Sequence, residues 1–260
     1  TIVIGEGEMD EAPMLYIGEK LGTLTGPKFD IAVDPLEGTK FTANNQPNAF
    51  SVLAISKKGE LLKAPDVYME KIAIGTNLPK NLLDLDNGVE KNIKLLAEAK
   101  NKKISNLSAC VMQRPRHKHI IDELLRLNVK INFITDGDIA GVLSVIGNKP
   151  VNDIYYSTGG APEGVLAAAA LSCFGGQMQG RLVLNEEEKI RAKKLGISDF
   201  KKKYNISEII KGDVIFCATG VTSGDLVKGV KDLGNEYEVN TYALHKSKKI
   251  IKTVTNIYNK

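Results

Sequence analysis

The sequence has few of the residues on which several common kinds of functional site depend. Its three cysteines lie in apolar segments without Cys-x-x-Cys spacing, and its three histidines lack the spacing of metal ligands. No apolar run approaches the ~18 residues that a transmembrane helix needs, and no signal peptide is visible. We therefore expect reduced cysteines, a cytoplasmic protein and no membrane partner.

Neither sign of charge dominates the chain. It contains 35 Lys and Arg against 31 Asp and Glu, which gives a net charge of +4 at pH 7. The lysines lie in stretches without interleaved aromatic residues, so we expect no nucleic-acid partner. Neither Gly-x-Gly-x-x-Gly nor the Walker spacing is present, which argues against nucleotide binding. The weak positive field would still favour a small anionic ligand.

The hydrophobic pattern predicts an α/β protein. The predicted strands are 1–4, 29–33, 49–56, 66–75, 107–112, 129–134, 153–157 and 213–218, and the predicted helices are 87–100, 116–127, 138–146, 162–174 and 186–195. The alternation after residue 100 is typical of βαβ units in a parallel sheet, and the last twenty residues are predicted as a hairpin. We expect two layered α/β lobes, 1–100 and 101–260, with ligand binding between them and the hairpin packed back on the first lobe.

One turn carries the strongest chemical signal. The segment Ile31–Thr39 reads IAVDPLEGT, so a β-branched run ends at Asp34 and a proline forces a turn before Glu37. Such a turn can direct both carboxylates into one space, where a hard cation such as Mg²⁺ or Mn²⁺ would neutralise them. Gly38 and Thr39 could then offer a backbone N–H and a hydroxyl to a phosphate. A turn with two solvated acids is the alternative for this segment taken alone.

Four further polar clusters follow predicted strands. They lie at Gly5–Glu11, Gln113–His117, Thr135–Asp138 and Ser157–Gly164. Because the carboxyl ends of strands are where α/β proteins usually bind ligands, these clusters together indicate one shared site.

These motifs resemble those of the class II fructose-1,6-bisphosphatases (GlpX type), which belong to the lithium-sensitive, metal-dependent sugar and inositol phosphatases. The matching segments are Gly5–Lys20, Asp34–Thr39, Ala64–Lys71, Gly159–Gly164, Met178–Leu182 and Ala218–Leu226. The resemblance runs in order along nearly the whole chain and implies the layered α-β-α-β-α sugar phosphatase fold. It also implies hydrolysis of the 1-phosphate of fructose 1,6-bisphosphate in gluconeogenesis. Sedoheptulose-1,7-bisphosphatase, alone or as a second activity, and a catalytically inactive sugar-phosphate-binding protein are the alternatives.

The resemblance also implies the metal ligands and the groups that act on the attacking water. Mn²⁺ or Mg²⁺ would be held by Glu6, Asp34, Glu37 and Glu163, with the Leu36 carbonyl as a further ligand. An acid–threonine pair, here Asp10 and Thr39, would orient the water. The alternative role of Asp10 is to cap a helix, and that of Thr39 is to cap its own turn.

The expected substrate contacts come from several loops. The candidate substrate-binding residues are Glu37, Gly38, Thr39, Tyr68, Arg114, Pro115, Arg116, Asp136, Gly137, Asp138 and Gly160. The arginines would grip a phosphate because their planar fork matches its oxygens, and the two aspartates would accept hydrogen bonds from sugar hydroxyls. Alternatively, Tyr68 is a core residue and the aspartates cap the helix that begins at Ile139.

The start of the chain is unusual, since Thr1 leads directly into an apolar strand without a methionine. Members of the resembled family carry a further segment upstream, including another metal-binding aspartate. We expect this segment to be missing here, and the resemblance implies a dimer or tetramer.

Overall fold

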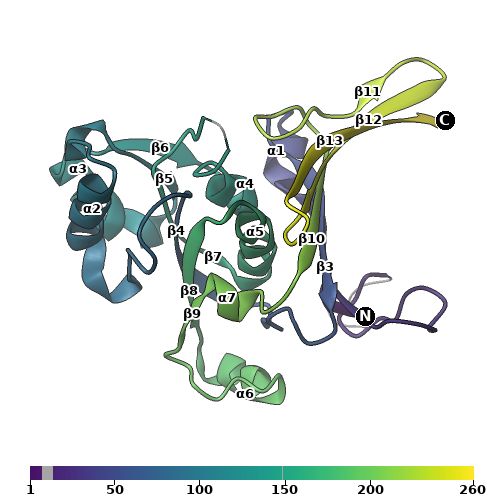
Figure 1. The fold of residues 1–260 in the computed structure, drawn as a ribbon, viewed down its shortest axis with the longest axis horizontal. Coiled ribbons are helices and arrows are strands. Elements are labelled where there is room, and N and C mark those ends of the chain that lie inside the picture. Colours follow the sequence, from purple (N-terminus) through teal and green to yellow (C-terminus); the bar gives the residue numbers. More distant parts are fainter. Residues whose placement is uncertain (8–13, 148) are drawn as a thin grey trace.

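The elements of the chain are arranged in layers. The computed structural model describes residues 1–7, 14–147 and 149–260. Figure 1 shows four layers in this part of the chain: helices, a six-stranded sheet, helices and a seven-stranded sheet. The α/β class predicted from the sequence is confirmed, and these layers are four of the five in the expected α-β-α-β-α order.

The seven-stranded sheet is mostly antiparallel. Its strands are β1 (Ile2–Ile4), β2 (Phe29–Glu37), β3 (Phe50–Lys57), β10 (Val214–Gly220), β11 (Lys231–Asp232), β12 (Glu236–His245) and β13 (Ile250–Asn259). Their order is β1-β2-β3-β10-β12-β11, with β13 paired to β12, and the β1–β2 pair is parallel. The hairpin predicted at the end of the chain is therefore present as β12 and β13.

The six-stranded sheet mixes parallel and antiparallel pairs. Its strands are β4 (Tyr68–Ile74), β5 (Ser108–Met112), β6 (Lys130–Ile134), β7 (Ile154–Gly160), β8 (Gln177–Val183) and β9 (Lys203–Asn205). The order is β6-β5-β7-β4-β8-β9, and the parallel pairs are β6–β5 and β5–β7. The predicted βαβ pattern thus holds for these three strands, whereas β4, β8 and β9 are added to them through antiparallel pairs.

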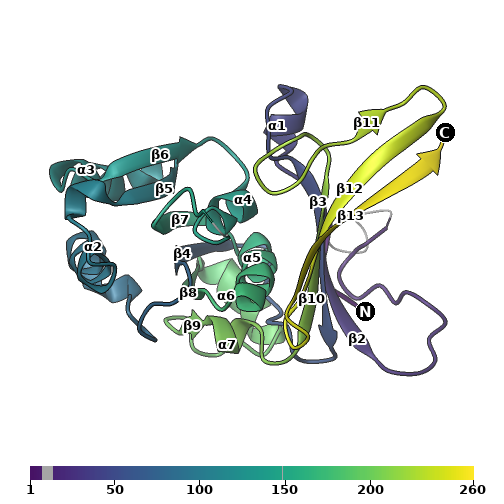
Figure 2. The ribbon, with the colours of Figure 1, turned by 45° about the horizontal axis from the view of Figure 1, so that its top comes forward.

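Helices cover one face of the six-stranded sheet and fill the space between the sheets. The α-helices are α1 (Thr39–Ala43), α2 (Gly88–Ala99), α3 (Lys118–Arg126), α4 (Asp138–Leu143), α5 (Ala161–Phe174), α6 (Glu186–Lys194) and α7 (Ile206–Ile209), and short 3₁₀ turns span Leu85–Asn87, Ile104–Asn106 and Pro115–His117. Helix α5 contacts strands of both sheets, and Figure 2 shows it between them. Its four consecutive alanines, 167–170, are fully or almost fully buried. Their small side chains let the two sheets pack closely on either side of the helix.

The predicted lobe boundary near residue 100 does not separate the sheets. Strand β4 precedes that residue but lies between β7 and β8, while β10 to β13 follow it and lie in the same sheet as β3. The chain therefore crosses between the sheets more than once, and residues distant in sequence meet where it crosses.

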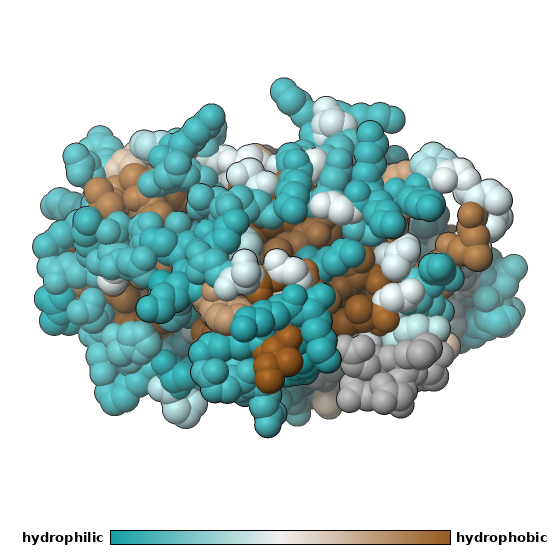
Figure 3. Space-filling view, turned by 90° about the horizontal axis from the view of Figure 1, so that it is seen from below, coloured by the Kyte–Doolittle hydropathy of each residue, from teal (hydrophilic) through white to brown (hydrophobic). Residues whose placement is uncertain are grey.

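Hydrophilic residues cover most of the face shown in Figure 3, and hydrophobic residues are visible in patches between them. Among the described residues, no helix is both long and apolar enough to cross a membrane.

Candidate active site

An acidic cleft of about 530 Å³ lies between the two sheets. Its walls come from the loops after β1 and β2, from the residues after β6 and from the start of α5. The predicted site residues that line it are Glu6, Leu36, Asp34, Glu37, Gly38, Thr39, Asp136 and Glu163. Five segments of the sequence were expected to share one site. Residues from four of them line this cleft: Gly5–Glu11, Ile31–Thr39, Thr135–Asp138 and Ser157–Gly164.

A bulge in β2 brings Asp34 and Glu37 to the same side. In a regular strand, residues three apart point to opposite faces of the sheet. The pairing of β2 with β3 shifts register between Asp34 and Glu37, because Pro35 cannot donate a ladder hydrogen bond. The Leu36 amide donates instead to Asp34 Oδ1 over 2.9 Å. The proline therefore explains how two acids of one strand can face one cleft.

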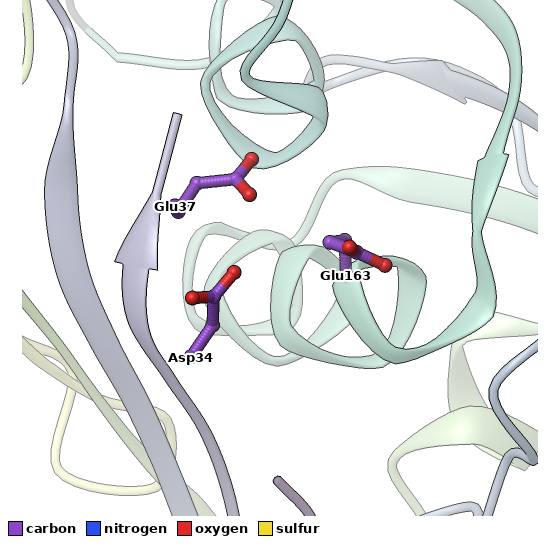
Figure 4. A group of neighbouring side chains, drawn as sticks. All are labelled: Asp34, Glu37 and Glu163. Atoms are coloured by element: carbon purple, nitrogen blue, oxygen red, sulfur yellow. The ribbon is translucent and has the colours of Figure 1, made fainter. Parts of the chain in front are cut away.

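Glu163 completes the acidic cluster from the opposite wall. It lies in the first turn of α5 after Pro162, a residue suited to the start of a helix. One carboxylate oxygen from each of Asp34, Glu37 and Glu163 lies within 4.8 Å of the others. Figure 4 shows the three carboxylates directed toward a common space.

The glycine before α5 makes room for this carboxylate. A Cβ on Gly160 would collide with Glu163 Oε2. That oxygen is buried and has no hydrogen-bond partner among the described residues. A buried carboxylate oxygen without a partner is costly unless a cation binds it.

The pKa values of the acids reflect their crowding. Burial raises the pKa of Glu37 well above its usual range, and the charges of Glu163 and Asp34 raise it further. Burial likewise raises the pKa of Asp34 and of Glu163. Carboxylates that repel one another in a dehydrated space, with only oxygen donors, fit a hard divalent cation such as Mg²⁺ or Mn²⁺.

Glu6 and Thr39 lie at the open side of the cleft. Both side chains are exposed. Burial and the nearby charge of Asp34 raise the pKa of Glu6, so this residue lies close enough to extend the cluster. Asp10, the predicted partner of Thr39, lies outside the described residues.

Asp136 and Asp138 occupy different environments although both were predicted to bind the sugar. Asp136 lines the cleft and accepts a hydrogen bond of 3.1 Å from the Lys40 amide. Asp138 is buried, and its two oxygens bind Lys71 Nζ and Tyr155 Oη. Asp136 is therefore open to the cleft, whereas the carboxylate of Asp138 is engaged within the protein.

Lys71 is the residue that sequence reasoning missed. Its side chain is fully buried, and its Nζ also donates to the Gly160 carbonyl over 2.7 Å. It thereby links β4, the start of α4 and the junction between β7 and α5. The available signal was a lysine inside the apolar strand Tyr68–Ile74, because a charge in a central strand is rarely buried without a partner.

The predicted phosphate-binding arginines follow β5, and one of them contacts Tyr68 at the start of β4. Arg116 lies over the Tyr68 ring, 4.7 Å from its centroid, and its Nε donates to the Thr158 carbonyl over 2.7 Å. Arg114 donates to the Thr135 carbonyl over 2.6 Å. Tyr68 is exposed rather than a core residue. These backbone contacts orient the guanidinium groups without cancelling their charge.

His117 holds the loop that carries both arginines. It is buried, its Nδ1 donates to the Met112 carbonyl over 2.6 Å, and its Nε2 accepts from the Thr158 amide over 2.8 Å. This arrangement needs a neutral ring, and burial lowers the pKa of His117. The histidine therefore has a structural role, in agreement with its lack of ligand spacing.

Known proteins match the chain over almost its full length. The sequence model described as "Bacterial fructose-1,6-bisphosphatase, glpX-encoded" matches residues 1–258. Fructose-1,6-bisphosphatase class 2 of Haemophilus influenzae is 41% identical over 272 residues, which cover 99% of this chain and 81% of that protein. Fructose-1,6-bisphosphatase 1 class 2 of Escherichia coli K12 is also 41% identical, over 274 residues, with the same coverage. A Synechococcus protein named D-fructose 1,6-bisphosphatase class 2/sedoheptulose 1,7-bisphosphatase is 40% identical over 285 residues, covering 100% of this chain and 82% of that protein.

Proposed function

The chain belongs to the glpX-encoded bacterial fructose-1,6-bisphosphatase family, and from this we propose how its acidic cleft performs the reaction. It is a metal-dependent fructose-1,6-bisphosphatase, a hydrolase that releases phosphate and fructose 6-phosphate in gluconeogenesis. The observation that carries the assignment of the cleft is the convergence of Asp34, Glu37 and Glu163 within 4.8 Å of one another.

These three acids, together with Glu6 and the Leu36 carbonyl, would hold Mn²⁺ or Mg²⁺. Glu163 Oε2 supports this role because it is buried near other acids and has no hydrogen-bond partner in the described part of the chain. When bound, a divalent ion supplies charge for the phosphoryl oxygens and lowers the pKa of a bound water. The protein contributes rigid ligands: the bulge at Pro35 aims two of them and the first turn of α5 aims the third.

Thr39 would orient the attacking water with its hydroxyl, and Asp10 would accept the proton. The position of Thr39 directly after Glu37 and Gly38, on the open side of the cleft, supports this role. Gly38 adopts a left-handed backbone, φ 80°, which turns the chain into α1 and brings the threonine back toward the acids.

Arg114 and Arg116 would bind the phosphate that is not cleaved. Pro115 between them restricts the backbone, and Tyr68 restricts Arg116 by stacking. Charge-assisted hydrogen bonds from two oriented arginines would fix the substrate with its other phosphate toward the metal site.

The sugar would contact Asp136 and the backbone of Gly137 and Gly160. Asp136 lies on the cleft wall. It directly follows Thr135, whose carbonyl accepts a hydrogen bond from Arg114. Asp138 would act indirectly, because its bond to Lys71 holds the elements that carry Glu37 and Glu163 in position.

A second activity on sedoheptulose 1,7-bisphosphate is also proposed. The name of the Synechococcus relative, which is 40% identical, favours it. The two ketose bisphosphates share the reacting end, so a site that recognises that end and a distal phosphate would accept both. Free cysteines at positions 110, 173 and 217 support a cytoplasmic location.

The test is phosphate release from fructose 1,6-bisphosphate with Mn²⁺ or Mg²⁺, followed by the same assay with sedoheptulose 1,7-bisphosphate. Glu163→Gln should lower kcat/KM by about 100-fold or more, since a ligand of the metal is lost, and should weaken Mn²⁺ binding measured directly by EPR. The control is Glu186→Gln, an exposed acid on α6. Binding of the sugar without turnover in the native protein would instead favour an inactive sugar-phosphate-binding protein.

A further inference from the structure

A segment that follows in the sequence holds the backbone of the metal-ligand candidate Glu6. The Glu6 amide donates to the Leu15 carbonyl over 3.0 Å, and the Ile17 amide donates to the Gly7 carbonyl over 2.9 Å. Glu6 lies in the loop directly after β1, so the strand fixes it from one side only. The place of its carboxylate at the open side of the cleft therefore depends on residues 15–17.

The backbone of Leu15 has an unusual conformation. Its φ is 57°, in the left-handed region that side chains make unfavourable. Glycine and asparagine adopt this region most readily, and six of the nine non-glycine residues with positive φ in the described part of the chain are asparagines. A leucine at such a position needs a contact that holds it there.

The carboxylate of Glu19 provides that contact. Its Oε2 accepts a hydrogen bond from the Leu15 amide over 2.5 Å. Glu19 is itself anchored, since its carbonyl accepts from the amide of Ile2 in β1 over 2.9 Å. A hydrogen bond to an ionised carboxylate is about twice as strong as one between neutral groups, so this contact offsets part of the cost of the left-handed backbone.

The Leu15 carbonyl lies directly against the backbone before Glu6. A Cβ on Gly5 would collide with this carbonyl oxygen, so only a glycine allows the approach. Leu15 accepts from Glu6 through its carbonyl and donates to Glu19 through its amide. Because φ and ψ of Leu15 set the angle between these two groups, a change at Glu19 alters the position of Glu6.

We propose that Glu19 is a positioning residue for Glu6: its carboxylate fixes the conformation of Leu15, and the Leu15 carbonyl then holds Glu6 at the metal site. Glu19 is not among the described residues that line the cleft, so it acts through Leu15 and not on the ion. The inference rests on the proposed function, in which Glu6 contributes to holding Mn²⁺ or Mg²⁺.

Hydrogen exchange in the metal-free native state tests the positioning without the ion. In Glu19→Ala the Glu6 amide should exchange about tenfold faster or more, because its acceptor on Leu15 is no longer held in place. Glu19→Gln keeps an acceptor oxygen and should give a smaller increase. Glu188→Ala is the matched control, since Glu188 also accepts a backbone amide, that of Asn185 over 2.7 Å, at the start of α6. Equal exchange of the Glu6 amide in Glu19→Ala and in the control would overturn the proposal.

Mn²⁺ binding measured by EPR shows whether the effect passes through Glu6. Glu19→Ala should raise the dissociation constant about tenfold in the native background. In the Glu6→Ala background the same change should have almost no further effect, because the side chain that it positions is absent. A tenfold loss in both backgrounds would mean that Glu19 supports the fold in general, and the proposal would be wrong.

A third variant tests the conformation of Leu15. Asparagine adopts the left-handed region more readily than leucine, so in the Leu15→Asn background Glu19→Ala should raise the dissociation constant for Mn²⁺ by only about threefold or less. An undiminished loss in that background would contradict the role given to Leu15.

Failure of this proposal and failure of the proposed function give different results. A native protein that binds no Mn²⁺ would contradict the proposed function. A native protein that binds Mn²⁺ with the same affinity as Glu19→Ala would overturn only the role of Glu19.

Discussion

Ile139 donates its amide N–H to Glu37 Oε1 over 2.9 Å, so the first turn of α4 holds a metal-ligand candidate of β2. The preceding residue, Asp138, binds the buried Lys71, which also binds the carbonyl of Gly160. The ammonium group of Lys71 thus connects the segment that holds Glu37 with the segment that carries Glu163. This arrangement gives Lys71 two roles, in the stability of the fold and in the geometry of the acidic cluster.

Replacing Lys71 by methionine should therefore destabilise the protein strongly. The variant leaves the Asp138 charge buried without its partner, which costs about 3–5 kcal/mol. Urea unfolding measures this free energy, and Mn²⁺ binding to the folded variant should weaken as well. Lys94→Met, which removes an exposed ion pair with Glu90, is the control and should have no measurable effect. Equal stability of the two variants would contradict the role of Lys71.

Gly160→Ala should weaken metal binding through a single added methyl group. The backbone of Gly160 suits alanine, φ −59° and ψ 141°, but its Cβ would collide with Glu163 Oε2. The carboxylate must then move, so the dissociation constant for Mn²⁺, measured by calorimetry, should increase. Gly212→Ala is a matched control because its Cβ would collide with the carboxylate of Glu60 outside the cleft. Similar metal affinities in both variants would mean that Glu163 does not bind the ion.

Arg116→Ala should affect substrate binding more than the chemical step. Loss of a charge-assisted hydrogen bond to phosphate costs about 1.5–3 kcal/mol, which corresponds to an increase in KM of about 10- to 100-fold. Steady-state kinetics at saturating Mn²⁺ would separate KM from kcat. Lys118→Ala removes a nearby exposed cation and should leave KM unchanged. A fall in kcat without a change in KM would place Arg116 in the chemical step instead.

His117 should make the stability of the protein depend on pH. Burial lowers its folded pKa below the usual 6.5, so the unfolded chain binds the proton more tightly. The stability that depends on the neutral ring is present above pH ~6.5 and is lost as the pH falls through the folded pKa. Urea unfolding between about pH 7 and pH 5 should show this loss.

Two variants isolate the contribution of this ring. In His117→Gln the fall in unfolding free energy toward pH 5 should be smaller than in the native protein. His119→Gln changes an exposed histidine two residues away and should keep the native pH dependence. If both variants follow the native curve, another group causes it.

Much of the acidic cleft could be predicted because its signals are local. Pro35 lacks an N–H, so the turn between Asp34 and Glu37 follows from three neighbouring residues. The alternation from β5 to α5 was also readable from hydrophobic spacing, as was the terminal hairpin, whereas β8 and β9 were not predicted. The family resemblance then assigned Glu163 to the same metal site as the turn. The residues next to Glu163 in the sequence do not by themselves indicate this.

Other parts of the site were not predictable in this way. Asp136 and Asp138 have the same side chain two positions apart, yet one lines the cleft and the other is buried against Lys71. Which of the two carboxylates can contact a ligand depends on the place of β4 between β7 and β8, because β4 carries Lys71. Nothing in the local sequence encodes that order of strands.

The amino-acid sequence by itself determined the chemical character of this protein: oxygen donors and arginines at strand ends, with no thiol or imidazole cluster. Those properties depend on residue type and on neighbours in the chain. Only the tertiary structure decided which acids converge in the cleft and that Asp138 is neutralised by Lys71. These outcomes depend on burial and on contacts between segments far apart in sequence, and burial sets the electrostatic cost of each charge.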